Sequence, residues 1–150
     1  MTKKILVPID LEHKSSWIKA LPEAVAQAEA FRGKIWVMTV VPHLAGDLDW
    51  RYTIQDDEQG GLKFDINDLV GQAEKRLREL ASEYAPKDLV GGITAKHGTI
   101  YERIIETADR LEIDLIVMTA HRPSLKDYLV GPNTARVSRH ADCSVLILRD

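Results

Sequence analysis

The chain has 150 residues, with 20 lysines and arginines, 23 aspartates and glutamates, and a formal net charge of -3. This length is typical of one domain, spanning residues 1–150, that buries a substantial core. Charges of both signs are interspersed along the chain, so no basic face of the kind that binds nucleic acid or an anionic membrane is indicated.

The first predicted element is a strand at residues 4–9, where a nearly continuous apolar run is typical of a strand buried on both faces. Pro8 and Asp10 interrupt this apolar run. The interruption comes too early for the core of a signal peptide or for a membrane span. We therefore expect a cytoplasmic protein with neither a membrane nor a nucleic-acid partner.

A helix and a second strand are predicted next. Ser15 or Ser16 can cap the helix, and Gly33 can end it. Pro22 falls inside the pattern, which predicts a bend or a late start, because proline lacks a backbone donor and clashes with the preceding turn. Residues 35–41 form the second apolar strand. The predicted inner face of the helix consists of Ile18, Leu21, Val25 and Ala28.

Residues 42–66 show no periodic pattern, and a segment of this length is typical of a functional or mobile loop. Helical spacing then returns, with Asn67 as its predicted cap and Pro86 as its end. The inward positions are Leu69 or Val70, Ala73, Leu77, Leu80 and Tyr84. The third strand, at residues 89–95, contains Gly91 and Gly92, as expected of an edge strand or a bulge.

The last part of the chain predicts a helix, a strand, a loop, a short helix and a final strand. Residues 115–118 form the fourth strand, the short helix opens after Gly131, and the final strand runs from Ser144 to Leu148. Cys143 has no cysteine partner and is interpreted as a small buried hydrophobe. The first of these helices carries Ile100, Ile104, Ala108 and Leu111 inward. Alternating strands and helices of these lengths predict a parallel sheet with helices on both faces.

In such sheets, ligands bind at the carboxyl ends of the strands, where the strand order reverses. The aspartate that leaves the first strand, Asp10, can accept hydrogen bonds from ribose hydroxyls. Backbone groups at Val40 and Val41 can contact an adenine edge. The alternative is that Asp10 only caps the following helix. The other candidates by this rule are Pro8, Ile9, Met118 and Thr119, with the loop from Thr119 to Gly131.

The sequence gives little support to a metal site or to catalysis. No cysteine pair or HxxxH spacing accompanies the five histidines, His13, His43, His97, His121 and His140. There is no G-x-S-x-G elbow and no GKS or GKT phosphate loop. We therefore predict no catalytic residues and no metal ligands.

Three segments together resemble the universal stress protein family: ILVPID at the start, TVVP after the second strand and HRPSLKDYLVGPNTARVSRHADCSVLILR at the end. The resemblance implies a Rossmann-like α/β fold of the adenine-nucleotide alpha hydrolase-like type, with five parallel strands in the order 3-2-1-4-5. It also implies an ATP site whose loop reads G-x2-G-x9-G-(S/T), and a homodimer in which the strands from Ser144 to Leu148 of two subunits associate.

This chain departs from the family loop at three positions. Thr119 and Arg122 stand where the family has its first two glycines, Gly131 matches the third, and Pro132 replaces the serine or threonine. The segment from Arg122 to Gly131 is also one residue shorter than the family pattern, as in the F- and G-type branch, which has a similar HRP sequence.

Proline offers neither the N–H nor the hydroxyl that serine would direct at a phosphate. The amide of Asn133 and the free N–H groups of the helix can compensate, and Arg122, Lys126 or Arg136 can supply charge. The nucleotide is expected to be ATP, ADP or AMP, with Mg²⁺ as a further ligand. Three function classes remain: a nucleotide-responsive dimeric stress protein with an unknown protein partner, a dimeric interaction module without nucleotide, and a slow ATPase. The residues expected to contact the nucleotide are Pro8, Ile9, Asp10, Val40, Met118, Thr119, His121, Arg122, Gly131, Pro132 and Asn133.

Overall fold

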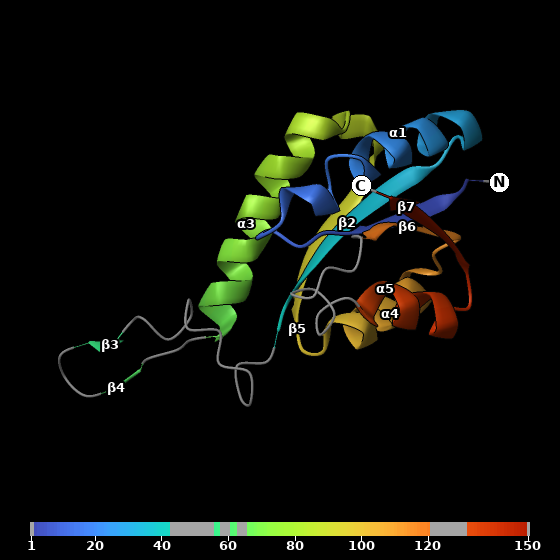
Figure 1. Cartoon of the computed structure of the whole chain (residues 1–150). Coiled ribbons are helices and arrows are strands. Elements are labelled where there is room, and N and C mark those ends of the chain that lie inside the picture. Colours follow the sequence, from blue (N-terminus) through green and yellow to red (C-terminus); the bar gives the residue numbers. More distant parts are fainter. Residues whose placement is uncertain (1, 43–55, 58–60, 63–65, 121–131, 150) are drawn as a thin grey trace.

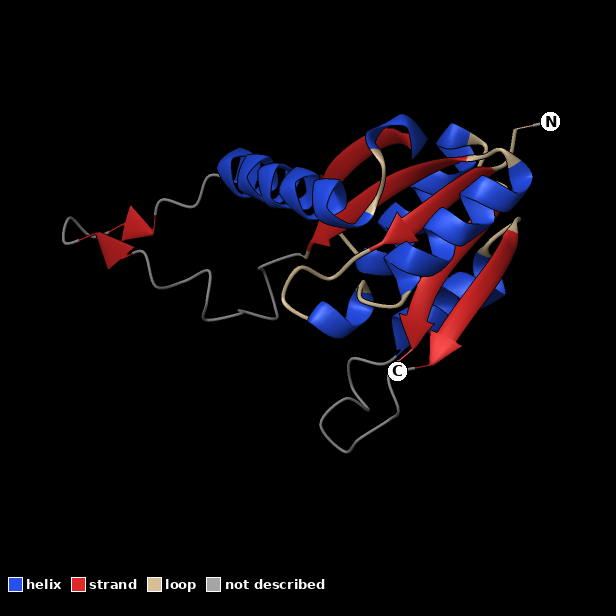
Figure 2. Cartoon of the chain, turned by 90° about the horizontal axis from the view of Figure 1, so that it is seen from above, coloured by secondary structure: helices blue, strands red, loops and turns tan. Residues whose placement is uncertain are grey.

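A five-stranded parallel sheet organises the protein (Figure 1). The computed structural model describes residues 2–42, 56–57, 61–62, 66–120 and 132–149. The strand order is β5-β2-β1-β6-β7, which confirms the predicted order 3-2-1-4-5, and the five arrows point the same way in Figure 2. The strands are β1 (Lys4–Pro8), β2 (Lys34–Val41), β5 (Val90–His97), β6 (Leu115–Ala120) and β7 (Ser144–Arg149).

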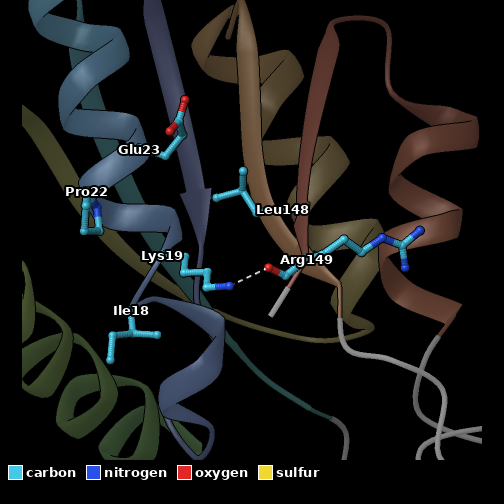
Figure 3. Close-up of a pocket in the computed structure, with 6 residues that line it drawn as sticks. All are labelled: Ile18, Lys19, Pro22, Glu23, Leu148 and Arg149. Carbon is cyan, nitrogen blue, oxygen red and sulfur yellow. Dashed lines mark hydrogen bonds between the residues drawn. The ribbon is translucent and has the colours of Figure 1, made fainter.

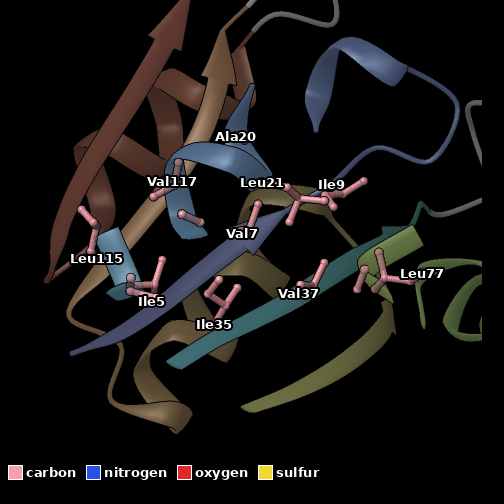
Figure 4. Close-up of a cluster of buried hydrophobic side chains, with 13 residues drawn as sticks. Ile5, Val7, Ile9, Ala20, Leu21, Ile35, Val37, Leu77, Leu115 and Val117 are labelled. Carbon is pink, nitrogen blue, oxygen red and sulfur yellow. The ribbon is translucent and has the colours of Figure 1, made fainter. Parts of the chain in front are cut away.

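Helices cover both faces of this sheet, as predicted. The helices α1 (Ala20–Phe31) and α3 (Ile66–Tyr84) lie on one face, and α4 (Ile100–Leu111) and α5 (Pro132–His140) lie on the other (Figure 1). Successive side chains of a strand point to opposite faces, so β1 serves two cores. Ile5 and Val7 pack with α1 and α3 (Figure 4), whereas Leu6 packs with α4 and α5. Both cores are built almost entirely from aliphatic side chains.

The first helix begins later than the seryl caps predicted. A 3-10 turn, η1 (Lys14–Ser16), precedes α1, and Pro22 lies in the first turn of α1, where a missing N–H costs nothing. Ile18 was predicted to face the core and is 44% exposed, because it lies before the helix starts. Gly33 follows the helix end, where a Cβ would collide with the carbonyl oxygen of Lys3.

Helix α3 starts at Ile66, so Asn67 lies inside its first turn and the predicted cap position is wrong. Leu77 and Ala81 are buried against the sheet, and Leu80 and Tyr84 pack beside them, as the spacing predicted. Most of the preceding segment lies outside the described residues. In its described part, two short antiparallel strands, β3 (Asp56–Asp57) and β4 (Gly61–Leu62), replace the patternless loop that we expected.

The third predicted strand is confirmed as an edge strand with a bulge. The register of β5 on β2 shifts between Ile35 and Trp36, which pair with Val90 and Gly92, so Gly91 is the extra residue. A Cβ on Gly91 or Gly92 would lie 2.6 or 2.9 Å from atoms of the Trp36 ring. The two glycines therefore allow the indole to lie flat against this edge. A short 3-10 turn, η2 (Lys87–Leu89), leads into the strand.

Within the parts of the chain that the structure describes, no helix combines the length and the apolar character needed to cross a bilayer. Over the same residues, no three acidic, histidine or cysteine side chains are grouped in a way that could hold a metal ion.

Candidate functional site

The sheet opens between β1 and β6, where the strand order reverses. β1 pairs with β2 along its whole length, but it pairs with β6 only at Ile5 and Leu6. β6 continues beside β7 as far as Ala120. The two central strands therefore stop sharing a ladder before their carboxyl ends. This is the position at which open α/β sheets bind ligands.

Pro8 explains how the ladder stops without leaving a buried donor unpaired. The N–H of Ile9 donates to the carbonyl of Met38 on β2, at 2.8 Å. Neighbouring residues of a strand direct their backbone groups to opposite sides, so residue 8 faces β6. Proline has no N–H to lose on that side.

The boundary between β1 and β6, called the seam below, is held by hydrogen bonds at its opposite, amino end. The Lys4 N–H donates to Asp114 Oδ2 and the Asp114 N–H donates to the Lys4 carbonyl, both at 2.8 Å. The Lys4 ammonium also donates to the carbonyl of Leu111 at 3.1 Å. The seam is thus closed at one end and free of ladder pairing at the other.

Asp10 lies just beyond β1, in a loop that hydrogen-bonds to itself. The Asp10 N–H donates to Ser16 Oγ at 2.9 Å, and the Ser16 hydroxyl donates to the Asp10 carbonyl at 3.0 Å. Asp10 Oδ1 accepts from the N–H of Glu12 at 2.9 Å, and Oδ2 lies 2.8 Å from Nδ1 of His13. The N-cap of α1 is Lys19, so the alternative reading of Asp10 as that helix's cap is wrong.

The structure gives Ser16 a role different from the predicted cap, since the buried hydroxyl anchors both backbone groups of Asp10. The side chain of Asp10 keeps 55% of its surface exposed. An anchored backbone and an exposed carboxylate suit a residue that accepts hydrogen bonds from a ligand.

At the ends of β1 and β2, Pro8 and Ile9 are buried, and the Ile9 carbonyl accepts a hydrogen bond from Thr39 Oγ1 at 2.7 Å. Sequence reasoning missed Thr39, although a polar residue within an apolar strand is a usable signal. Met38 faces β1, so Val40, two residues on, directs its backbone groups to the same side, past the last paired residue of β1.

The backbone groups of Val40 therefore face the side of β2 on which β1 has ended. The carbonyl of its neighbour Val41 accepts the N–H of Gly98 at 3.1 Å. The carbonyl of Val41 is thus already engaged by Gly98, and the adenine contact predicted for Val40 and Val41 stays a prediction.

At the end of β6, Met118 and Thr119 are both buried. Met118 packs against α4 and α5, and Thr119 Oγ1 has no hydrogen-bond partner among the described residues. Pro132 and Asn133 begin α5, which confirms the helix predicted to open after Gly131. The predicted contacts His121, Arg122 and Gly131, together with Lys126, lie outside the described residues.

Two other predicted groups have structural surroundings of their own. The guanidinium of Arg136 stacks over the ring of Tyr101 at 5.2 Å, so an aromatic face already engages this candidate phosphate partner. Cys143 is half-buried and packs beside the α4–α5 core. Burial raises the pKa of the Cys143 thiol, with smaller contributions from Asp109, Asp114 and Asp142, so the thiol has little nucleophilic character at neutral pH.

One groove of the described surface lies beside the open seam and not over it. It has a volume of about 460 Å³ and lies between the start of α1 and the end of β7 (Figure 3). Across it, the ammonium of Lys19 donates to the carbonyl of Arg149 at 2.8 Å. Its lining residues are Ile18, Lys19, Pro22, Glu23, Leu148 and Arg149. Asp10 and Thr119 do not line it, so this groove is separate from the candidate site.

Known proteins share both this sequence and this fold. A model of the universal stress protein family matches residues 1–149. Universal stress protein G of Shigella flexneri is 27% identical over 149 residues, which cover 99% of this chain and all of that protein. A universal stress protein solved in complex with cAMP has a TM-score of 0.61 at 18% identity, covering 99% of this chain and 97% of its own.

A universal stress protein family protein from Arabidopsis thaliana, solved with AMP bound, has a TM-score of 0.54 at 18% identity, covering 98% of this chain and 91% of its own. At these identities, the solved structures support the fold alone. The match of the family model over residues 1–149 establishes the relationship. The chain belongs to the universal stress protein family.

Proposed function

We propose that this protein binds an adenine nucleotide at the carboxyl ends of β1, β2 and β6 and acts as a dimeric regulatory module in a stress response. The observation that carries the proposal is the end of β1–β6 pairing after Leu6, with the exposed Asp10 carboxylate beyond it. The cAMP and AMP bound to two structural neighbours support the choice of ligand class.

In this proposal, the ribose, the adenine and the phosphates each contact a different part of the fold. The Asp10 carboxylate accepts hydrogen bonds from the ribose, and the backbone of Val40 contacts the adenine edge. The N-terminus of α5, at Pro132 and Asn133, faces the phosphates, because unpaired N–H groups and the helix dipole favour anions there. AMP, ADP and ATP all share this recognition, and Mg²⁺ accompanies the polyphosphates.

Calorimetry of the purified protein with AMP and with Mg²⁺-ATP tests the proposal. We expect saturable heat and a rise in melting temperature, and Asp10→Asn should weaken binding about tenfold or more, because a hydrogen bond to a charged group contributes about 1.5–3 kcal/mol. Asp109→Asn, an exposed change on α4, removes the same charge and should leave the affinity unchanged. If no heat and no thermal shift are seen at millimolar nucleotide, the proposal is refuted and the chain is an interaction module without nucleotide.

In the proposed site, Pro132 weakens the binding of the phosphates. As the first residue of α5, it brings no N–H to the helix N-terminus. Pro132→Ser adds an N–H and a hydroxyl there, and we expect tighter binding of ATP by roughly one to two decades. An unchanged affinity would mean that the loop grips the phosphates elsewhere.

We also propose that a second copy of this chain pairs with the edge of β7. Its apolar residues from Val145 to Leu148 are only half-buried, whereas the core residues of the adjacent β6 are buried. An unpaired apolar edge favours association, and a twofold dimer is the commonest solution. The groove along α1 and β7 extends this surface.

Light scattering at micromolar concentration tests the dimer, and a monomer mass would contradict it. Ile147 is half-buried and belongs to neither core, so Ile147→Lys should yield monomers without unfolding the protein. Thr94→Lys makes the matched change on the opposite edge strand, β5, and should leave the dimer intact.

A further inference from the structure

Two groups of the same loop contact the carboxylate of Asp10. The N–H of Glu12 reaches Oδ1 at 2.9 Å, and Nδ1 of His13 lies 2.8 Å from Oδ2. An ionised carboxylate only accepts hydrogen bonds and offers about four lone-pair positions on its two oxygens. These two contacts use one position on each oxygen, and because the side chain is 55% exposed, the remaining positions are accessible to a ligand.

We propose that His13 is a positioning residue for ribose recognition, which holds the Asp10 carboxylate in the orientation that accepts the ribose hydroxyls. This inference rests on the proposed function and adds a residue of this chain to it. His13 acts through Asp10 and needs no contact with the nucleotide.

The need for such a residue follows from exposure. The side chains of Asp10 and His13 are 55% and 60% exposed, and an unrestrained aspartate at that exposure would sample several rotamers. The peptide N–H of Glu12 restrains one oxygen, and the imidazole restrains the other. Both donors belong to the same loop, so the side chain is ordered before a ligand arrives and less entropy is lost on binding.

The charge state of the imidazole does not decide the contact. Nδ1 must carry a proton when it lies against a carboxylate oxygen, and both the neutral Nδ1–H tautomer and the imidazolium satisfy this condition. The positioning therefore requires only a proton on Nδ1.

A residue of helix α3, Arg76, also contacts this loop. Arg76 donates to the carbonyl of Leu11 at 3.3 Å and lies 3.6 Å from the carboxylate of Glu12. Together with the Ser16 anchor, these contacts hold the backbone on both sides of His13. The ring is thus carried by a fixed loop, which is what a positioning role requires.

The test measures how well the protein distinguishes AMP from 2′,3′-dideoxy-AMP, using calorimetric Kd values for both. His13→Phe keeps a ring but no donor, whereas His13→Asn keeps a neutral donor close to the place of Nδ1. We expect the wild type to prefer AMP by about tenfold or more. His13→Phe should reduce this preference about three- to tenfold and leave the Kd of the dideoxy nucleotide unchanged.

His13→Asn should restore the preference to within about twofold of the wild type, because the donor and not the ring is the active element. A variant that unfolds the site would bind both nucleotides more weakly to the same extent. The ratio of the two Kd values therefore separates a positioning role from an effect on folding. A full preference for AMP in His13→Phe overturns the inference. Equal binding of the two nucleotides by the wild type also overturns it but leaves nucleotide binding standing, whereas binding of neither refutes the proposed function as well.

Discussion

The hydroxyl of Thr39 offers the sharpest test of how the site is supported. Thr39 is 5% exposed, and its Oγ1 donates to the Ile9 carbonyl at 2.7 Å. Thr39→Val keeps the shape of the side chain but removes this donor from a buried acceptor. Leaving a buried group unsatisfied costs about 1–3 kcal/mol, a large share of a total stability of about 5–15 kcal/mol.

The matched control is Thr119→Val, because Thr119 is 8% exposed and its hydroxyl has no partner in the described part of the chain. Here valine removes a buried polar group that gains nothing, so the stability should stay the same or rise.

Urea and thermal unfolding of both variants without ligand provide the assay, with the m-value checked for constancy. At this chain length, Thr39→Val should lower the melting temperature by about 3–10 °C. Equal losses in the two variants would refute the reasoning, since both threonines would then contribute alike whatever their partners.

Three further outcomes are expected. Gly92→Ala places a Cβ 2.9 Å from the Trp36 ring and should cost about 1–3 kcal/mol in chemical unfolding, and Trp36→Leu in the same chain should recover part of that loss. Glu112, the C-cap of α4, has φ 55°, so Glu112→Gly should raise the free energy of unfolding by up to about 1 kcal/mol, and a lower melting temperature would contradict this. The raised pKa of Cys143 should make its alkylation by iodoacetamide slow at pH 8. Any stability due to the protonated thiol should be lost as the pH rises through that pKa, and a series of melting temperatures at increasing pH measures this loss.

The periodicity of the sequence predicted the elements well, and the family resemblance supplied the strand order. The errors lie where local geometry competes with periodicity. Ile18 fits the helical spacing, but a 3-10 turn and Pro22 delay the helix beyond it. Asn67 resembles a cap, yet helical geometry already includes Ile66. Strands of two residues, such as β3 and β4, are too short to leave any periodic signal.

The candidate site was less predictable, because its support consists of specific hydrogen bonds made by side chains. The rule about strand ends located Asp10 and Val40, but it could not show that Ser16 anchors Asp10 or that His13 contacts its carboxylate. Pro8 in a buried strand marks the place where pairing with a neighbour must stop, and this is where the seam opens.

The seam between β1 and β6 also has a consequence for folding kinetics. Its fastened end joins Lys4 to Asp114, 110 positions apart, so the entropy of closing a long loop must be lost before that contact forms. The strands β1, β2 and β5 can assemble without waiting for β6 and β7, which form a neighbouring pair of their own. We therefore expect two half-sheets to dock late in folding and to separate first in unfolding, which makes the short β1–β6 ladder the element that sets the lifetime of the native state.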